Sequence, residues 1–192
     1  MRKVALLSLL MLLVAVPAFA APPNYFVLKG GIYSPGHEDL TAVANGDFDI
    51  GFNGEVAFGH YFTPNIAVEL GAGYLATSSP AAKADIDAWA IPILLSVKAV
   101  APFPQGEIYA LAGVGAYLVE GKHVASGLKE TDTAFGFQVG IGGNYSITPE
   151  MFIGLEGKYF WAKASFPTIN VFDPKDVHFD GFQGTVNLGF RF

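Results

Sequence analysis

The sequence predicts an all-β fold, an eight-stranded antiparallel up-and-down transmembrane β-barrel. Three observations lead to this prediction. Eight segments alternate between apolar and polar side chains, and each has about the ten residues that a tilted membrane-spanning strand requires. The connectors between these segments alternate between long and short. The polar faces carry charged side chains, which lipid excludes and the inside of a barrel accommodates.

The first 20 residues are organised as a secretory signal peptide. Arg2 and Lys3 precede an apolar run over residues 4–16, and Ala18 and Ala20 form an A-x-A cleavage site. A run of thirteen residues is too short to span a bilayer as a helix, which takes about 20 residues. We therefore predict that residues 1–20 are cleaved. An uncleaved membrane anchor is the alternative.

The composition of residues 21–192, the predicted barrel domain, excludes several classes of protein. Removing Arg2 and Lys3 from the 11 Lys and Arg leaves 9 against 17 Asp and Glu, a formal charge of −8. This acidic balance argues against a nucleic-acid partner. The absence of Cys excludes a disulfide framework. The longest apolar stretch, residues 88–97, contains Pro92 and ends before Lys98, so no transmembrane helix is expected.

The first four segments each combine one apolar face with one polar face. Residues 24–33 set Phe26, Leu28 and Ile32 opposite Lys29. Residues 47–62 set Phe48, Ile50, Phe52, Val56 and Phe58 opposite Asp49, Asn53 and Glu55. Residues 66–74 set Ile66, Val68, Leu70 and Tyr74 opposite Glu69. Residues 88–98 set Trp89, Ile91, Ile93, Leu95 and Val97 opposite Pro92, Ser96 and Lys98.

Three of the last four segments repeat this pattern. Residues 133–147 set Phe135, Phe137, Val139, Ile141, Tyr145 and Ile147 opposite Gln138, Asn144 and Ser146. Residues 151–161 set Ile153, Leu155, Tyr159 and Trp161 opposite Glu156 and Lys158. Residues 182–192 set Phe182, Gly184, Val186, Leu188, Phe190 and Phe192 opposite Gln183, Thr185, Asn187, Gly189 and Arg191. One such strand would also suit a soluble sandwich, but the repetition indicates a membrane barrel.

The fifth segment, residues 107–119, is apolar on both faces. Tyr109, Leu111 and Tyr117 lie on one face, and Ile108, Val114 and Leu118 lie on the other. Period-two alternation therefore leaves two orientations open for this strand.

The predicted connectors are long after the odd-numbered segments and short after the even-numbered ones. The long connectors are residues 34–46, 78–86, 120–132 and 165–179, and the short ones are residues 63–65, 102–106 and 148–150. Long loops on one side and tight turns on the other are typical of an outer-membrane barrel with both termini in the periplasm.

The chain closes with GFRF, in which Phe190 and Phe192 flank Arg191. With the A-x-A signal and the eight alternating segments, this ending resembles bacterial outer-membrane proteins of the OmpA, OmpX and OmpW type. The resemblance implies location in the cell outer membrane after export through the periplasm. It also implies that Phe190 and Phe192 form the signal read by the barrel-assembly machinery. We expect no peptidoglycan-binding domain of the OmpA kind after the barrel, and no residue pattern separates OmpW from OmpX.

A set of charged side chains is expected to meet inside the barrel. These residues are Lys29, Glu55, Glu69, Lys98, Glu156, Lys158 and Arg191. An unpaired buried ion costs several kcal/mol, so we expect pairs of Glu156 with Lys98 or Arg191, and of Glu55 with Lys29. The interpretation is a salt-bridged plug, with a narrow water or ion path between the pairs as the alternative. A soluble lipocalin-like barrel would instead have to carry these charges on its outer surface.

An enzymatic alternative rests on the predicted loops. Lipid A palmitoyltransferases and deacylases are small barrels with a Ser and a His near the extracellular rim. Here Ser34 lies near His37, Glu38 and Asp39, and His123 lies near Ser126. Neither group reproduces a catalytic spacing, so the prediction is a protein without catalysis, cofactor or metal.

The predicted function is a structural role in the envelope with porin-like passage of small solutes. A lipid A acyltransferase or deacylase, or a surface adhesion barrel, is the alternative. The expected partners are outer-membrane lipid, lipopolysaccharide and the barrel-assembly machinery, and the expected state is a monomer.

Overall fold

The computed structural model describes residues 23–36, 50–79, 86–123, 129–164, 177–178 and 180–192. The predicted signal peptide with Ala18 and Ala20 lies outside these ranges. Within them, no helix is both long enough and apolar enough to cross a membrane.

The described residues form β-strands joined by tight turns and by the longer connecting segments. The strands are β1 (Asn24–Pro35), β2 (Gly51–Thr63), β3 (Ile66–Ser79), β4 (Ile86–Phe103), β5 (Gly106–His123), β6 (Lys129–Ser146), β7 (Met151–Ala164), β8 (Val177–His178) and β9 (Gly181–Arg191). Every pairing between them is antiparallel.

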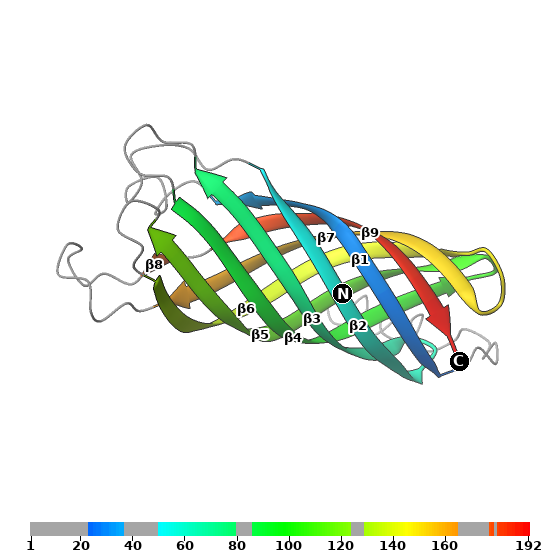
Figure 1. Cartoon of the computed structure of the whole chain (residues 1–192). Coiled ribbons are helices and arrows are strands. Elements are labelled where there is room, and N and C mark those ends of the chain that lie inside the picture. Colours follow the sequence, from blue (N-terminus) through cyan, green and yellow to red (C-terminus); the bar gives the residue numbers. More distant parts are fainter. Residues whose placement is uncertain (1–22, 37–49, 80–85, 124–128, 165–176, 179) are drawn as a thin grey trace, which may run out of the picture.

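Eight of these strands close into a barrel, as predicted. Each strand from β1 to β7 pairs with the next, β7 pairs with β9, and β9 returns to β1 with Lys29 opposite Asn187. The two-residue strand β8 pairs with the last two residues of β7, Lys163 and Ala164. The tight turns gather at the end of the barrel where the C-terminus lies (Figure 1). Closure leaves no strand edge in lipid, where an unpaired backbone group is costly.

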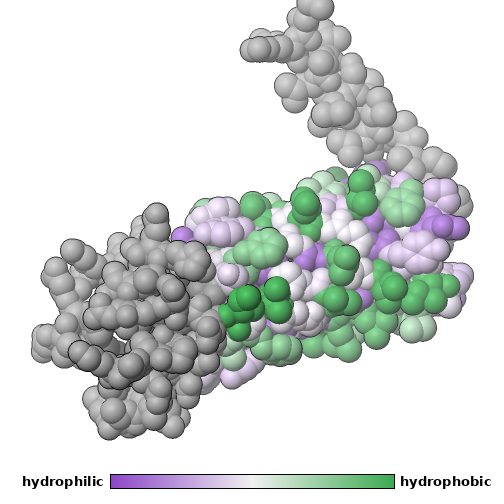
Figure 2. Space-filling model, turned by 90° about the horizontal axis from the view of Figure 1, so that it is seen from above, coloured by the Kyte–Doolittle hydropathy of each residue, from purple (hydrophilic) through white to green (hydrophobic). Residues whose placement is uncertain are grey.

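The alternation predicted for seven segments is confirmed where the side chains are described. The apolar faces point outward, and green patches cover the visible side of the barrel between purple and pale ones (Figure 2). The polar faces, with Asn53, Gln138 and Gln183 among them, are buried inside. Phe48 and Asp49 lie outside the described residues.

The structure resolves the orientation of the ambiguous fifth strand. In β5, Ile108 is 60% exposed on the outer surface, together with Val114 and Leu118. Tyr109 is 5% exposed and points inward with Leu111 and Tyr117. This orientation brings the Tyr109 hydroxyl to the Glu156 carboxylate, at 2.9 Å.

Several predicted connectors are shorter than the sequence indicated. The backbone of residues 120–123 and 129–132 belongs to β5 and β6, with Glu120 opposite Thr131, so the prediction of a loop over 120–132 was wrong at both ends. Similarly, β1 includes Ser34, β3 includes Ser78 and Ser79, and β4 reaches Phe103. At Ser34, at Ser78 and Ser79, and at residues 120–123 and 129–132, the strands continue beyond the apolar band into a polar sequence that hydropathy does not mark.

The interior is layered along the barrel axis. One apolar cluster lies toward the long connectors and contains Tyr33, Leu75, Ala90, Leu94, Tyr117, Ala134, Phe160 and Ala162. The other lies toward the tight turns and contains Tyr25, Val27, Ala57, Ala67, Val100, Tyr109, Leu111 and Phe152. On β1, Lys29 lies between Val27 of one cluster and Tyr33 of the other, and Lys98 on β4 lies likewise between Leu94 and Val100. Charged side chains therefore occupy the middle layer.

Candidate functional site

Strand alternation and register bring six predicted charges to the middle of the barrel. Lys29, Glu55, Glu69 and Lys98 come from β1 to β4 in order, and Glu156 and Lys158 both come from β7. Lys29 and Glu55 are direct neighbours across the β1–β2 pair. The two β7 residues face them from the opposite wall, so we call these six side chains the central ionic ring.

The central ionic ring alternates in charge. Lys29 lies 2.9 Å from Glu55 and 2.7 Å from Glu69. Glu69 also binds Lys98, and Glu55 also binds Lys158. Glu156 completes the circuit at 3.8 Å from Lys98 and 3.7 Å from Lys158. Its third ion pair is with Lys29, at 3.0 Å, so the Lys29 amine contacts all three carboxylates.

Two tyrosines extend the ring toward the end of the barrel with the tight turns. The Tyr25 hydroxyl donates to Glu69 Oε2 at 2.8 Å, and the Tyr109 hydroxyl donates to Glu156 Oε2 at 2.9 Å. The Lys98 amine lies over both rings, 5.5 Å from the Tyr25 centroid and 4.4 Å from the Tyr109 centroid. These contacts add hydrogen bonds and cation–π attraction to the ion pairs.

Burial makes complete pairing of the ring necessary. Its six side chains have exposed fractions between 0 and 5%. Taking charges out of water costs several kcal/mol per ion, which close opposite charges and further hydrogen bonds offset. Three amines face three carboxylates, so the ring is neutral as a unit. In the part of the chain that the structure describes, no group of three His, Cys, Asp or Glu side chains could hold a metal ion.

Arg191 forms a separate site near the tight turns. Its guanidinium donates to Ser146 Oγ at 3.0 Å, lies 4.5 Å from the Phe152 ring centroid and reaches Glu107 at 3.8 Å. Glu107 also accepts hydrogen bonds from Tyr61 at 2.8 Å and from Asn144 at 2.6 Å. The alternative pairing of Arg191 with Glu156 was therefore wrong, because Glu156 lies in the middle layer.

Sequence reasoning missed Glu107 because it begins the strand whose two faces are both apolar. Charge balance was the signal that could have found it. The predicted interior set contained four positive and three negative side chains, and a sealed interior requires one more carboxylate. Glu107 supplies that carboxylate beside Arg191.

The remaining predicted residues occupy other positions. Phe190 and Phe192 are exposed on the outer surface, and the Phe192 amide donates to the Asn24 carbonyl at 2.9 Å. Ser34 lies in β1, opposite Phe182. His37, Glu38, Asp39 and Ser126 lie outside the described residues, and the His123 side chain is not described.

Together, the closed wall, the apolar outer surface and the charged interior define a transmembrane β-barrel with a packed lumen. The chain belongs to the outer membrane protein beta-barrel domain family, whose sequence profile matches residues 6–192. The protein is thus located in the outer membrane, and its apolar surface contacts membrane lipid. No curated protein matches the chain.

Solved structures with the same fold come from several bacteria. Neisserial surface protein A is similar at a TM-score of 0.60 and 13% identity, over 88% of this chain and 97% of that one. A major outer membrane protein from Thermus thermophilus is similar at 0.60 and 13%, over 90% and 100%. The outer membrane protein OprG from Pseudomonas aeruginosa is similar at 0.57 and 14%, over 89% and 97%. At these identities, the similarity shows the fold.

Proposed function

We propose that the protein is a closed structural barrel of the outer membrane that contributes to envelope integrity and is not a general diffusion channel. The central ionic ring is the observation that carries this proposal. It crosses the lumen from β1–β4 to β7, and almost none of its surface is accessible to water. The ring ties opposite walls together and occupies the layer through which a solute would have to pass.

The two apolar clusters strengthen the barrier on each side of the ring. Tyr33 and Tyr117 pack against Phe160, with centroids at 5.6 and 5.3 Å, toward the long connectors. Tyr25 packs edge-on against Phe152 at 6.1 Å toward the tight turns. An ion crossing the barrel would lose its hydration in both layers, and eight strands leave little room beyond the side chains themselves.

Single-channel recording in planar bilayers tests the proposal. The full chain, verified as folded, should give no discrete conductance steps, while a sixteen-stranded porin in the same bilayers should conduct. Steps from the folded wild-type protein would contradict the proposal and favour passage through the lumen. The double variant Lys29→Ala/Glu156→Ala shows whether the ring is the barrier, because steps in this variant alone would assign the barrier to the ring.

Passage of small apolar solutes through the wall is a second candidate, and a gap in the β3–β4 pairing favours it. The pairs Ala72–Ile93 and Leu75–Ala90 flank this gap. Gly73 and Pro92 lie within it, and a Cβ atom added at Gly73 would lie 3.2 Å from Pro92 Cγ. Pro92 has no N–H to donate, so the wall is weaker there. Pro92→Ala should restore the pairing and slow the entry of a radiolabelled apolar solute into proteoliposomes. An unchanged entry rate would oppose this candidate.

Lipid A modification and surface adhesion remain alternatives of other classes. Both would rest on the connecting segments, most of which lie outside the described residues. Substitution of His37 or His123 would abolish a change in lipid A mass if the barrel were such an enzyme. Transplanting the connectors would transfer partner binding if it were an adhesin.

The assembly and partner predictions also stay proposals. Phe190 and Phe192 would be read by the barrel-assembly machinery, and lipopolysaccharide would contact the barrel from the outer leaflet. Phe192 is paired with β1 in the folded barrel, so such reading has to precede closure. The monomeric state can be measured by analytical ultracentrifugation in detergent.

A further inference from the structure

Small residues on the lipid-facing wall are covered by aromatic rings in one region of the barrel. A Cβ atom added at Gly54 would lie 3.3 Å from the Phe52 ring. Cβ atoms added at Gly157 and Gly184 would lie 3.4 and 3.7 Å from the Phe182 ring. These rings lie over the bare backbone, as aromatic residues do beside glycine in other sheets.

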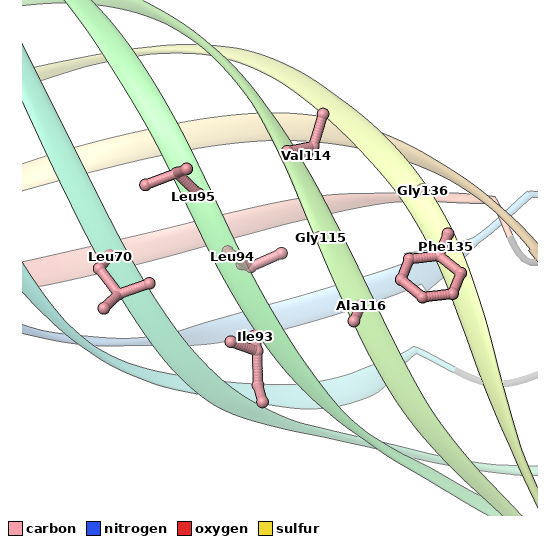
Figure 3. Close-up of a pocket in the computed structure, with 9 residues that line it drawn as sticks. All are labelled: Leu70, Ile93, Leu94, Leu95, Val114, Gly115, Ala116, Phe135 and Gly136. Atoms are coloured by element: carbon pink, nitrogen blue, oxygen red, sulfur yellow. The ribbon is translucent and has the colours of Figure 1, made fainter.

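The opposite wall has an uncovered depression over β5. Ala116 is flanked in register by Ile93 on β4 and by Phe135 on β6, both of which project into the lipid. The depression is an apolar groove of about 400 Å³. Its lining comes from four consecutive strands: Leu70, Ile93, Leu94, Leu95, Val114, Gly115, Ala116, Phe135 and Gly136 (Figure 3).

The side chains around the groove leave it open to the membrane. Phe135 is 73% exposed and Ile93 is 47% exposed, so both stand out from the wall as ridges beside Ala116. The next row, Leu95, Val114 and Phe137, is large throughout. Ala116 is therefore the one small outward-facing side chain of the lining, and Gly115 and Gly136 add no bulk beside it.

The aromatic girdles place the groove in the extracellular half of the membrane. On β4, Trp89 stacks with Tyr74 toward the long connectors, and Phe103 is exposed at the tight turns. Ile93 lies four residues from Trp89 and ten residues from Phe103. Because aromatic girdles mark the two membrane interfaces, this part of the wall faces the outer leaflet.

We propose that this groove is a binding site for one acyl chain of an outer-leaflet lipid. No lining side chain has a hydrogen-bonding group, so the site offers nothing to a polar ligand. The groove is continuous with the surface that contacts lipid, which supplies hydrocarbon chains at high local concentration. An acyl chain gains dispersion contacts with Ile93 and Phe135 on both sides, which a chain on a convex part of the barrel lacks.

Photolabelling tests the proposal on the full chain. The protein is reconstituted in phosphatidylcholine vesicles with the long connectors facing outward, as checked by protease cleavage. Phosphatidylcholine with a diazirine on its acyl chain is then exchanged into the outer monolayer. After irradiation, mass spectrometry should find adducts at Ile93, Val114 and Phe135 at several times the yield at Val186, which is 62% exposed on another wall.

Two variants of one strand separate a site from general lipid contact. Ala116→Leu fills the groove and should lower the yield at Ile93 and Phe135 to that at Val186. Ala110→Leu adds the same bulk to the exposed face of β5 outside the lining and should leave the yield unchanged. If Ala116→Leu does not fold, Ala116→Gly deepens the groove and should raise the yield.

Three results would overturn the proposal. Adducts in proportion to exposed area would mean ordinary lipid contact. A yield that does not respond to the size of residue 116 would exclude the groove. Labelling of Ile93 and Phe135 that disappears as the protein-to-lipid ratio is raised would mean that a second barrel covers this wall.

Discussion

The same strands build the interior and the lipid-facing surface, but the side chains of the two regions have different surroundings. Leu94 and Leu95 are neighbours on β4, yet Leu94 is 3% exposed inside the barrel and Leu95 is 49% exposed to lipid. Inside, each side chain has fixed neighbours, and each charge has named partners. Outside, fluid hydrocarbon adapts to any apolar shape. For the free energy of unfolding, the identity of a side chain should therefore matter inside the barrel, and its apolarity alone should matter outside.

The largest effect should follow from breaking the central ionic ring. Lys29→Met leaves Glu55, Glu69 and Glu156 with two lysines, so the free energy of unfolding should fall by about 3–5 kcal/mol. Urea titration in lipid vesicles measures this loss. The double variant Lys29→Met/Glu156→Gln restores equal numbers of charges and should recover part of the loss. A single-variant loss below about 1 kcal/mol would show that the ring is not tightly coupled.

The two leucines of β4 test the comparison directly. Leu94→Ala should lower the free energy of unfolding by about 2–5 kcal/mol, because it leaves a cavity among fixed neighbours. Leu95→Ala should cost about 2 kcal/mol, the transfer free energy of the lost carbons, because lipid fills the space. Equal losses in the same urea titrations would mean that lipid adapts no better than the packed interior.

A charged side chain on the outer wall tests whether apolarity is required there. Val186→Arg lies in the middle of β9 and should lower the free energy of unfolding by about 2–4 kcal/mol. Phe192→Arg lies at the end of the same face and should cost about 0–1 kcal/mol. A depth-independent cost would argue that Val186 does not face the hydrocarbon core.

Two interior tyrosines give the finest test of partner identity, and one of them should show no loss of stability at all. Tyr109→Phe removes the hydrogen bond to Glu156 and should cost about 1.5–3 kcal/mol. Tyr33 Oη is buried and has no hydrogen-bond partner in the described residues, so Tyr33→Phe should be neutral or stabilising. A larger loss of stability for Tyr33→Phe than for Tyr109→Phe would contradict the view that the hydroxyl with a hydrogen-bond partner is the stabilising one.

Most of the barrel wall could be predicted from the sequence because the side chains of a membrane-spanning strand alternate between lipid and lumen. Phe26, Leu28 and Ile32 had to face lipid once Lys29 faced the lumen, since successive side chains point to opposite sides. The same rule identified the six members of the central ionic ring. The rule failed where both faces are apolar, as at Tyr109 and Ile108. It also failed where both faces are polar, as at Glu120 and Thr131.

The sequence by itself determined which residues face lipid on seven strands, the closed antiparallel architecture and the charges that had to be buried. Only the tertiary structure decided the inward face of β5, and with it the positions of Glu107 and Tyr109. It also decided that Lys29 contacts three carboxylates and that Arg191 meets Glu107 instead of Glu156. Alternation acts between adjacent residues, whereas the Lys29–Glu156 contact joins side chains 127 residues apart, so it depends on the stagger of all eight strands.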